Sequence, residues 1–166
     1  MALKLKIAEP DEAEEIAALR CAAADDLTAR FGKGHWSTQT TARGVLFDMR
    51  QNKVFAAKRR GRIVATLVLG TRKPWAIDVS YFTPFKAKAL YLTAMAVAPK
   101  HQRAGIGRAC LDEAERLARA WPTPAIRLDA YDADAGAGEF YAKCGYREVG
   151  RASYRTTPLI YFEHLL

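Results

Sequence analysis

The chain has 166 residues, of which 50% are hydrophobic, and a formal net charge of +8 at pH 7. This length and composition predict one compact domain over residues 1–166. No apolar run approaches the roughly 20 residues that cross a bilayer, and residues 1–6 do not form a secretory leader, so we expect a soluble cytoplasmic protein without a membrane partner. The three cysteines are odd in number and widely spaced, which suggests neither a disulfide framework nor a metal site.

The first third of the chain predicts a strand followed by two helices. Residues 3–7 alternate between apolar residues and lysine, which is the period of a half-buried strand. Pro10 and the acidic residues after it are typical of a helix start. The inner face of this helix is expected to carry Ile16, Leu19, Ala23 and Leu27. A second, shorter helix is expected over residues 40–49.

The middle of the chain predicts a hairpin and a buried strand. Residues 54–58 and 62–69 flank a turn at Arg60–Gly61. Residues 70–89 contain two prolines and several aromatic residues, and we expect them either to extend the hairpin or to form a flap over substrate. Leu90–Val97 is nearly continuous in apolar residues, as in a strand covered on both faces.

The last part of the chain predicts two helices and three strands. An apolar stripe predicts a helix over residues 108–121, which two prolines close. Residues 125–131 predict a strand and residues 135–143 a short helix. A further strand is expected from Tyr146, and the last over residues 157–165.

The net positive charge raises the possibility of a nucleic-acid partner. Lys58, Arg59, Arg60 and Arg62 bracket the predicted hairpin turn, where such a charge run is usually solvated surface. No helix rich in arginine and asparagine stands out as a recognition helix. The sequence therefore disfavours nucleic acid, and a basic nucleic-acid-binding domain is the weakest of three hypotheses for function.

A glycine-containing loop, Gln102–Arg108, joins the strand at residues 90–97 to the following helix. Gly105 and Gly107 permit unusual backbone dihedrals and remove side-chain bulk, so successive N–H groups can converge on a diphosphate at the positive end of the helix. The ATP-type loop needs a Gly-Lys-Ser/Thr ending, which is missing here, and the dinucleotide loop needs a third glycine where this chain has Cys110. Mononucleotide and nicotinamide ligands are therefore less favoured.

These residues resemble the GNAT family of N-acetyltransferases. The family signature is Gln or Arg, two residues, Gly, one residue, then Gly or Ala, and here it reads Gln102-Arg103-Ala104-Gly105-Ile106-Gly107. It follows a strand with a Val-x-Pro ending at Val97–Pro99. The stretch from Asp134 to Tyr146 is similar to a second family element, with Asp134 in place of the usual Asn. The resemblance covers residues 54–150 well.

The resemblance implies an α/β (α+β) fold, in which a central mixed, mostly antiparallel sheet splays between its fourth and fifth strands and is flanked by helices. It also implies acetyl-CoA as co-substrate, with its pantetheine arm lying along the fourth strand as in strand addition. The residues implied to bind it are Met95, Ala96, Val97, Gln102, Arg103, Ala104, Gly105, Ile106, Gly107, Arg108, Asp134 and Tyr141. No metal is implied.

The resemblance also implies catalytic roles for Val97 and Tyr141. The N–H of Val97 would polarise the thioester carbonyl and stabilise the oxyanion, and Tyr141 would protonate the departing sulfur. The general base stays open, because Asp78, Asp129 and Glu163 could each reach an amine directly or through water. His35 and Trp36 could shape the acceptor pocket.

The leading hypothesis is an enzyme that moves an acetyl group from acetyl-CoA to a primary amine by direct attack in a ternary complex. The acceptor is the amine of a small molecule or a peptide, which this sequence does not specify. The alternative is a non-catalytic acetyl-CoA-binding sensor or regulatory module, which needs the loop but no acid at Tyr141. A homodimer through the final strand is a further expectation.

Overall fold

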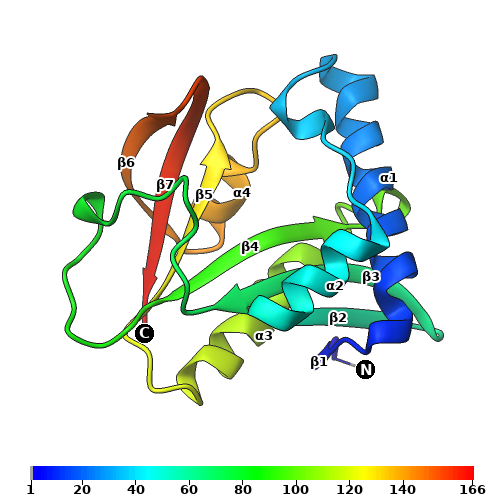
Figure 1. Ribbon diagram of the computed structural model, residues 1–166, viewed down its shortest axis with the longest axis horizontal. Helices are drawn as coiled ribbons and strands as arrows, with labels where there is room; N and C mark the ends of the chain where they lie inside the picture. Colours follow the sequence, from blue (N-terminus) through cyan, green and yellow to red (C-terminus); the bar gives the residue numbers. More distant parts are fainter. Residues whose placement is uncertain (1) are drawn as a thin grey trace.

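A computed structural model describes residues 2–166 (Figure 1). It is built on a seven-stranded sheet with the order β1-β2-β3-β4-β5-β7-β6. The strands are β1 (Leu5–Ile7), β2 (Lys53–Arg59), β3 (Arg62–Gly70), β4 (Leu90–Val97), β5 (Ala125–Tyr131), β6 (Arg147–Tyr154) and β7 (Thr157–Leu165). The helices are α1 (Ala13–Phe31), α2 (Ala42–Gln51), α3 (Ile106–Arg119) and α4 (Gly138–Lys143). Short 3-10 turns are η1 (Pro10–Glu12), η2 (His35–Ser37), η3 (Val79–Tyr81) and η4 (Pro99–His101).

The sheet is mixed but mostly antiparallel. Among the strands of residues 2–166, only β4 and β5 pair in parallel, and every other neighbouring pair is antiparallel. Helices lie on both faces of it (Figure 1). The predicted fold class is therefore confirmed. Within residues 2–166, no helix is both long and apolar enough to cross a bilayer.

Two hydrophobic clusters hold the helices to opposite faces of the sheet. Successive strand residues point to opposite faces, so Phe55 of β2 lies in one cluster and Val54 in the other. The first cluster includes Ile106 and Leu111 of α3, and the second includes Ile16 of α1. The helices α1 and α2 therefore cover one face, while α3 and α4 cover the other.

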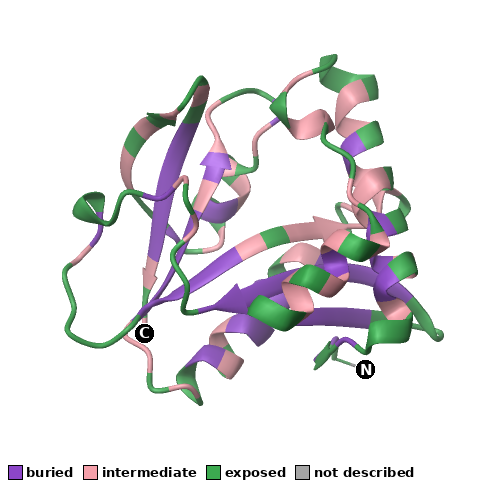
Figure 2. Ribbon diagram, in the orientation of Figure 1, coloured by how far each residue is buried: buried purple, intermediate pink, exposed green. Residues whose placement is uncertain are grey.

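The sheet opens between β4 and β5. These strands pair only at Leu90–Ile126 and Tyr91–Arg127, and they then diverge. Leu90–Leu92 is buried, but the rest of β4 is intermediate or exposed (Figure 2). The prediction that Leu90–Val97 is covered on both faces is therefore correct only for its first residues, because β5 turns away and leaves the second half of β4 with a free edge.

A bulge at Ala94 accompanies this opening. Ala94 has a positive φ of 50°, which is uncommon for a residue with a side chain. The register against β3 shifts here, since Val68 pairs with Thr93 while Thr66 pairs with Ala96. The strand β4 thus holds one extra residue, and such bulges bend a strand and re-aim its backbone groups.

The strand β7 lies inside the sheet, between β5 and β6. Its backbone groups are paired on both sides, with Ile160 opposite Ala130 and Arg151. The edges of the sheet are β1 and β6 instead. Backbone pairing of two copies through β7 is therefore excluded, because β7 has no free edge, and the homodimer itself stays a prediction.

Most observed element boundaries agree with the predicted ones within a few residues, but the starts of two helices differ. The helix α3 begins at Ile106 rather than at residue 108, because Gly105 adopts a positive φ of 81° as its N-cap. The helix α4 begins at Gly138 rather than at residue 135. Before it, the chain makes a turn in which the N–H of Gly136 donates to the carbonyl of Ala133 at 2.8 Å. A Cβ at Gly136 would lie 1.9 Å from the carbonyl oxygen of Tyr131, so this turn requires glycine.

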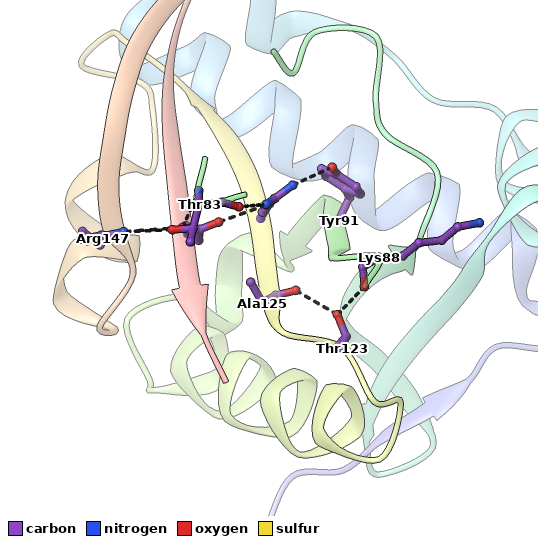
Figure 3. A network of polar contacts seen from close by, with 8 residues as sticks. Thr83, Lys88, Tyr91, Thr123, Ala125 and Arg147 are labelled. Atoms are coloured by element: carbon purple, nitrogen blue, oxygen red, sulfur yellow. Dashed lines mark hydrogen bonds and ion pairs between the residues drawn. The ribbon is translucent and has the colours of Figure 1, made fainter. Parts of the chain in front are cut away.

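Residues 71–89 do not extend the hairpin, and they are anchored to β5 and β7. The buried carboxylate of Glu163 accepts from Arg127 Nε at 3.0 Å and from Thr83 Oγ1 at 2.6 Å. Arg127 Nη1 also donates to the Tyr91 hydroxyl at 3.2 Å, and Arg147 approaches Glu163 to 3.6 Å. Figure 3 shows Thr83, Tyr91 and Arg147 around this network. One half of the segment is thereby held against the sheet.

Glu163→Gln is expected to lower the free energy of unfolding by about 3 kcal/mol, because it leaves the buried Arg127 without its counter-ion. Urea denaturation measures this. The matched control is Glu148→Gln, which removes a carboxylate that pairs with Arg151 while both side chains are roughly half exposed. The control should cost less than about 1 kcal/mol. Equal costs for the two variants would contradict a structural role for Glu163.

Candidate functional site

The loop before α3 presents a row of free backbone donors. The first backbone bond of the helix runs from the N–H of Ala109 to the carbonyl of Gly105 at 3.0 Å. Within residues 2–166, the N–H groups from Arg103 to Arg108 donate to no protein acceptor. Arg103 and Gly105 both have positive φ values, of 59° and 81°, a backbone pattern that makes successive N–H groups converge. The row lies at the positive end of α3, so it fits a diphosphate.

The two glycines of the loop are required for different structural reasons. A Cβ at Gly105 would meet nothing within 4 Å, so this position needs glycine for its φ and is open to a ligand. A Cβ at Gly107 would lie 3.0 Å from Cζ of Phe140. The missing side chain at Gly107 therefore accommodates α4 rather than an anion.

Several side chains of the loop are engaged within the protein. Gln102 Nε2 donates to the carbonyl of Val97 at 3.0 Å, which ties the loop to the end of β4. Arg108 Nη2 donates to the carbonyl of Lys143 at 2.7 Å and caps α4. Ile106 is buried in the core, whereas Arg103 and Ala104 are exposed. Of the basic side chains in the loop, Arg103 is the one left free to approach a polyanion.

The second half of β4 turns backbone groups toward the opening in the sheet. The N–H of Ala98 donates to Val64 of β3 at 2.9 Å. Because N–H groups of successive residues in an extended strand point to opposite edges, the N–H of Val97 points away from β3. The same alternation applies to Met95, two residues earlier, while Ala96 pairs with Thr66 of β3. The predicted residues Met95 and Val97 thus line the free edge.

A cavity of about 340 Å³ lies at this opening. Its lining includes Thr93 and Met95 of β4, Asp129 of β5, Tyr141 of α4 and Leu27 of α1. The cavity is therefore lined by elements from both faces of the sheet.

Tyr141 is buried, and its hydroxyl lies 3.8 Å from Sδ of Met95. Burial raises the pKa of the Tyr141 hydroxyl above its ordinary value, and the charge of Asp129 raises it further. The hydroxyl consequently stays protonated at neutral pH. It is a hydrogen-bond donor facing the cavity.

Asp129 is the carboxylate of this cavity. It forms no hydrogen bond or ion pair with the described residues, and burial raises its pKa. The other two base candidates lie elsewhere and are engaged. Glu163 is held by Arg127 and Thr83, while Asp78 accepts from Ser80 N at 3.0 Å and from Ser80 Oγ at 2.7 Å. Only Asp129 of the three faces Tyr141.

Two further predicted site features lie beside the cavity. Asp134 is exposed and does not line it, although the residues that follow, Ala135–Ala137, do. The rings of His35 and Trp36 pack against Tyr131, with centroids 6.4 and 6.3 Å away. Since Tyr131 lines the cavity, His35 and Trp36 support its wall. Contact of Asp134, His35 or Trp36 with a ligand stays a prediction.

Arg20 of α1 is a buried cation that the sequence patterns did not indicate. This residue lies four positions after Ile16 and seven before Leu27, on the stripe of α1 that faces the sheet. Its side chain is only 9% exposed, and Nη1 bonds Asp48 of α2 at 3.0 Å. Its Nε and Nη2 are buried without a partner among residues 2–166. A charged residue at an inward helical position was the signal that could have identified it.

A second cavity, of about 250 Å³, is likewise not predicted by the sequence patterns. Phe47 and Gln51 of α2 line one side, and residues 72–75 line the other. Thr93 lines both cavities, so the second adjoins the first. The described residues contain no cluster of three or more side chains suited to hold a metal ion.

Comparison with known proteins matches residues 19–146 to the model of the acetyltransferase (GNAT) family. Among curated proteins, no sequence matches significantly. An acetyltransferase from Streptococcus agalactiae has a TM-score of 0.75 and 14% identity over 99% of this chain and 95% of its own. An N-acetyltransferase from Staphylococcus aureus has a TM-score of 0.71 and 15% identity over 99% of both chains. A putative acetyltransferase from Salmonella typhimurium, solved with its cofactor acetyl-CoA, has a TM-score of 0.69 and 15% identity over 99% of this chain and 94% of its own.

Proposed function

This chain belongs to the GNAT family of acetyltransferases, and on that premise we propose that it moves an acetyl group from acetyl-CoA to a primary amine by direct attack in a ternary complex. The proposal assigns this activity to residues 1–166 as a single domain. The observation that carries it is the free N–H row of Arg103–Arg108 next to an opening in the sheet where Asp129 and Tyr141 face one cavity. The acetyl-CoA in the Salmonella typhimurium relative supports the choice of co-substrate.

The binding of acetyl-CoA is assigned to backbone groups. The diphosphate would accept hydrogen bonds from the N–H groups of Arg103–Arg108 and would be stabilised by the dipole of α3. The amides of the pantetheine arm would pair with the free edge of β4 at Met95 and Val97, as an added strand does. Both sets of donors are preformed, so little reorganisation is needed on binding.

The chemistry is assigned to three groups around the opening. Asp129 accepts the proton that the attacking amine must lose, and its raised pKa suits that role better than an ordinary aspartate. The N–H of Val97 stabilises the negative charge that develops on the carbonyl oxygen as the amine nitrogen bonds the acyl carbon. Tyr141 donates its hydroxyl proton, or a strong hydrogen bond, to the sulfur as the carbon–sulfur bond breaks.

The alternative function is a non-catalytic acetyl-CoA sensor. It would use the same N–H row, but it would not need a protonated hydroxyl and an unpaired carboxylate facing one cavity, so the geometry favours the enzyme. Release of free thiol from acetyl-CoA, followed with a panel of small amines and peptides, tests the choice. A protein that binds acetyl-CoA yet acetylates no amine, with the acetylated product sought by mass spectrometry, would favour the sensor.

Asp129→Asn is expected to lower kcat/KM at pH 7 by about 100-fold, because it removes the general base. The loss should shrink as the pH rises, since neutral amine then becomes abundant without assistance. A pH profile of kcat/KM measures both effects. The matched control is Asp112→Asn on the exposed side of α3, which should leave the profile unchanged. A wild-type profile in the Asp129 variant would remove Asp129 from the mechanism.

The stability of the same variant gives an independent readout. Burial raises the pKa of Asp129 in the folded state above its unfolded value of about 3.9, so the folded protein favours the neutral acid. Wild-type stability therefore declines as the pH rises through that raised pKa. Asparagine is always neutral, so Asp129→Asn should be more stable than wild type at pH 7 and equally stable below about pH 3.9. An active-site variant that is slower but more stable is not explained by misfolding.

A further inference from the structure

We propose that the acceptor is a small zwitterionic amine, whose anionic group is bound in the second cavity by Arg72 and Lys73 while its amine meets Asp129. This inference rests on the proposed acetyl transfer and names the substrate class for it. The anionic group is a carboxylate or another oxyanion of similar size.

The second cavity lies between α2 and the residues that follow β3. Arg72, Lys73 and Trp75 line it opposite Phe47 and Gln51 of α2, and its volume is about 250 Å³. Thr93 lines this cavity as well as the one that holds Asp129 and Tyr141, so the two cavities adjoin at this residue. The proposal places one small molecule across both. A small ligand with two different ends suits this arrangement.

The two cations of this cavity form no direct ion pair with the described residues. Arg72 Nη1 donates to Oε1 of Gln51 at 2.6 Å. Lys73 Nζ donates to the carbonyls of Pro74 at 3.0 Å and Ile77 at 2.8 Å. All of these acceptors are neutral, and neither cation pairs with a carboxylate among residues 2–166. The wall therefore keeps its positive charge available to an anion.

The charges across the two cavities are arranged as a dipole. Asp129 is the one carboxylate that lines either cavity in the described structure, and it lines the first cavity, whereas Arg72 and Lys73 line the second. Hydrogen bonds from Ser80, and to a smaller extent the charge of Lys73, lower the pKa of Asp78, but Asp78 lines neither cavity. A molecule with an ammonium at one end and an anion at the other matches this pattern, whereas a polycation would be repelled by Arg72 and Lys73.

Two exposed aromatic side chains flank the cations. Trp75 is 88% exposed and Phe47 is 53% exposed, although both line the cavity. Large apolar side chains left this open beside a cavity are typical of a ligand site, because a bound apolar group would cover them. The acceptor is therefore expected to carry an apolar or aromatic part between its two charges.

Matched amines test the anion preference. The probes are 4-(aminomethyl)benzoate and two amines without an anionic group, 4-(aminomethyl)benzamide and benzylamine. The wild-type kcat/KM should be at least about 10-fold higher for the benzoate than for either of the other two, as expected for a charge-assisted contact. The double variant Arg72→Gln, Lys73→Gln should lose that preference. The control Arg59→Gln, Lys6→Gln removes two exposed cations that line neither cavity and should keep it.

Direct binding separates this inference from the reaction itself. Calorimetry with 4-methylbenzoate and 4-methylbenzamide should show tighter binding of the carboxylate to wild type, and equal binding to the Arg72 and Lys73 double variant. Equal binding to wild type would overturn the inference whether or not acetyl transfer occurs. A carboxylate preference without any acetyl transfer would retain the anion site and reject the proposed function. A peptide amine preferred over every small anionic probe would overturn the small-molecule class.

Discussion

Gly105→Glu is expected to weaken acetyl-CoA binding by at least about 100-fold, because it places a carboxylate beside the N–H groups that would hold the diphosphate. Like charges about 4 Å apart near a protein surface repel by about 4 kcal/mol, which is ample for this loss. The glutamate can also accept hydrogen bonds from the same N–H row. Isothermal titration calorimetry with acetyl-CoA measures the change in Kd.

Two control variants separate the effect of the added charge on Kd from the effect of backbone strain. Gly61 also has a positive φ, of 75°, with nothing within 4 Å of a built Cβ, but it lies in the β2–β3 turn. Gly61→Glu thus adds the same charge and a similar strain of about 1–2 kcal/mol away from the loop, and it should leave Kd unchanged. Gly105→Ala adds strain without charge, and its effect should be smaller. Unchanged affinity in Gly105→Glu would reject the assignment of the diphosphate site.

Tyr141→Phe is expected to lower kcat by about 100-fold or more, because the departing sulfur loses its proton donor. The Kd for acetyl-CoA should stay within about 2-fold, since the proposed binding contacts are backbone groups of the loop and β4. Because burial and the charge of Asp129 raise the pKa of Tyr141, the hydroxyl stays protonated and no loss of the acid is expected at mildly alkaline pH. Single-turnover acetyl transfer measures the chemical step separately from product release.

Tyr146→Phe is the matched control for this variant. The ring centroids of Tyr141 and Tyr146 are 5.9 Å apart, and the hydroxyl of Tyr146 is buried without a partner among residues 2–166. Its removal should leave kcat unchanged and should stabilise the fold by up to about 1 kcal/mol, since an unsatisfied buried hydroxyl is costly. An unchanged single-turnover rate in Tyr141→Phe would instead support the sensor hypothesis.

The sequence alone predicted the order of the elements, and the glycine loop before α3 lies where the pattern placed it. The range of β7 agrees with the prediction, and the β2–β3 hairpin agrees within one residue, because apolar alternation and a turn glycine are local signals. The loop also depends on a local signal, because the positive φ of Gly105 sets the path of the adjacent backbone at the start of α3. Features that depend on a few consecutive residues can be read from those residues.

The sequence could not assign the general base. Asp129 and Glu163 are both carboxylates on apolar strands, and nothing nearby in the chain distinguishes them. The pairing of β5 with β7 places Glu163 opposite Arg127 and Asp129 opposite Tyr161. One carboxylate is thereby neutralised by a buried cation, while the other faces the cavity without a partner.

The sequence by itself predicted the family, the helices and strands, and a loop of free backbone N–H groups before α3, because periodicity and glycine positions act over short distances. Only the tertiary structure decided which carboxylate faces Tyr141, where residues 71–89 are held, and that Arg72 and Lys73 line a cavity next to Asp129. These features depend on burial and on pairs of residues far apart in the chain. Burial and charge compensation arise only when the strands and helices assemble.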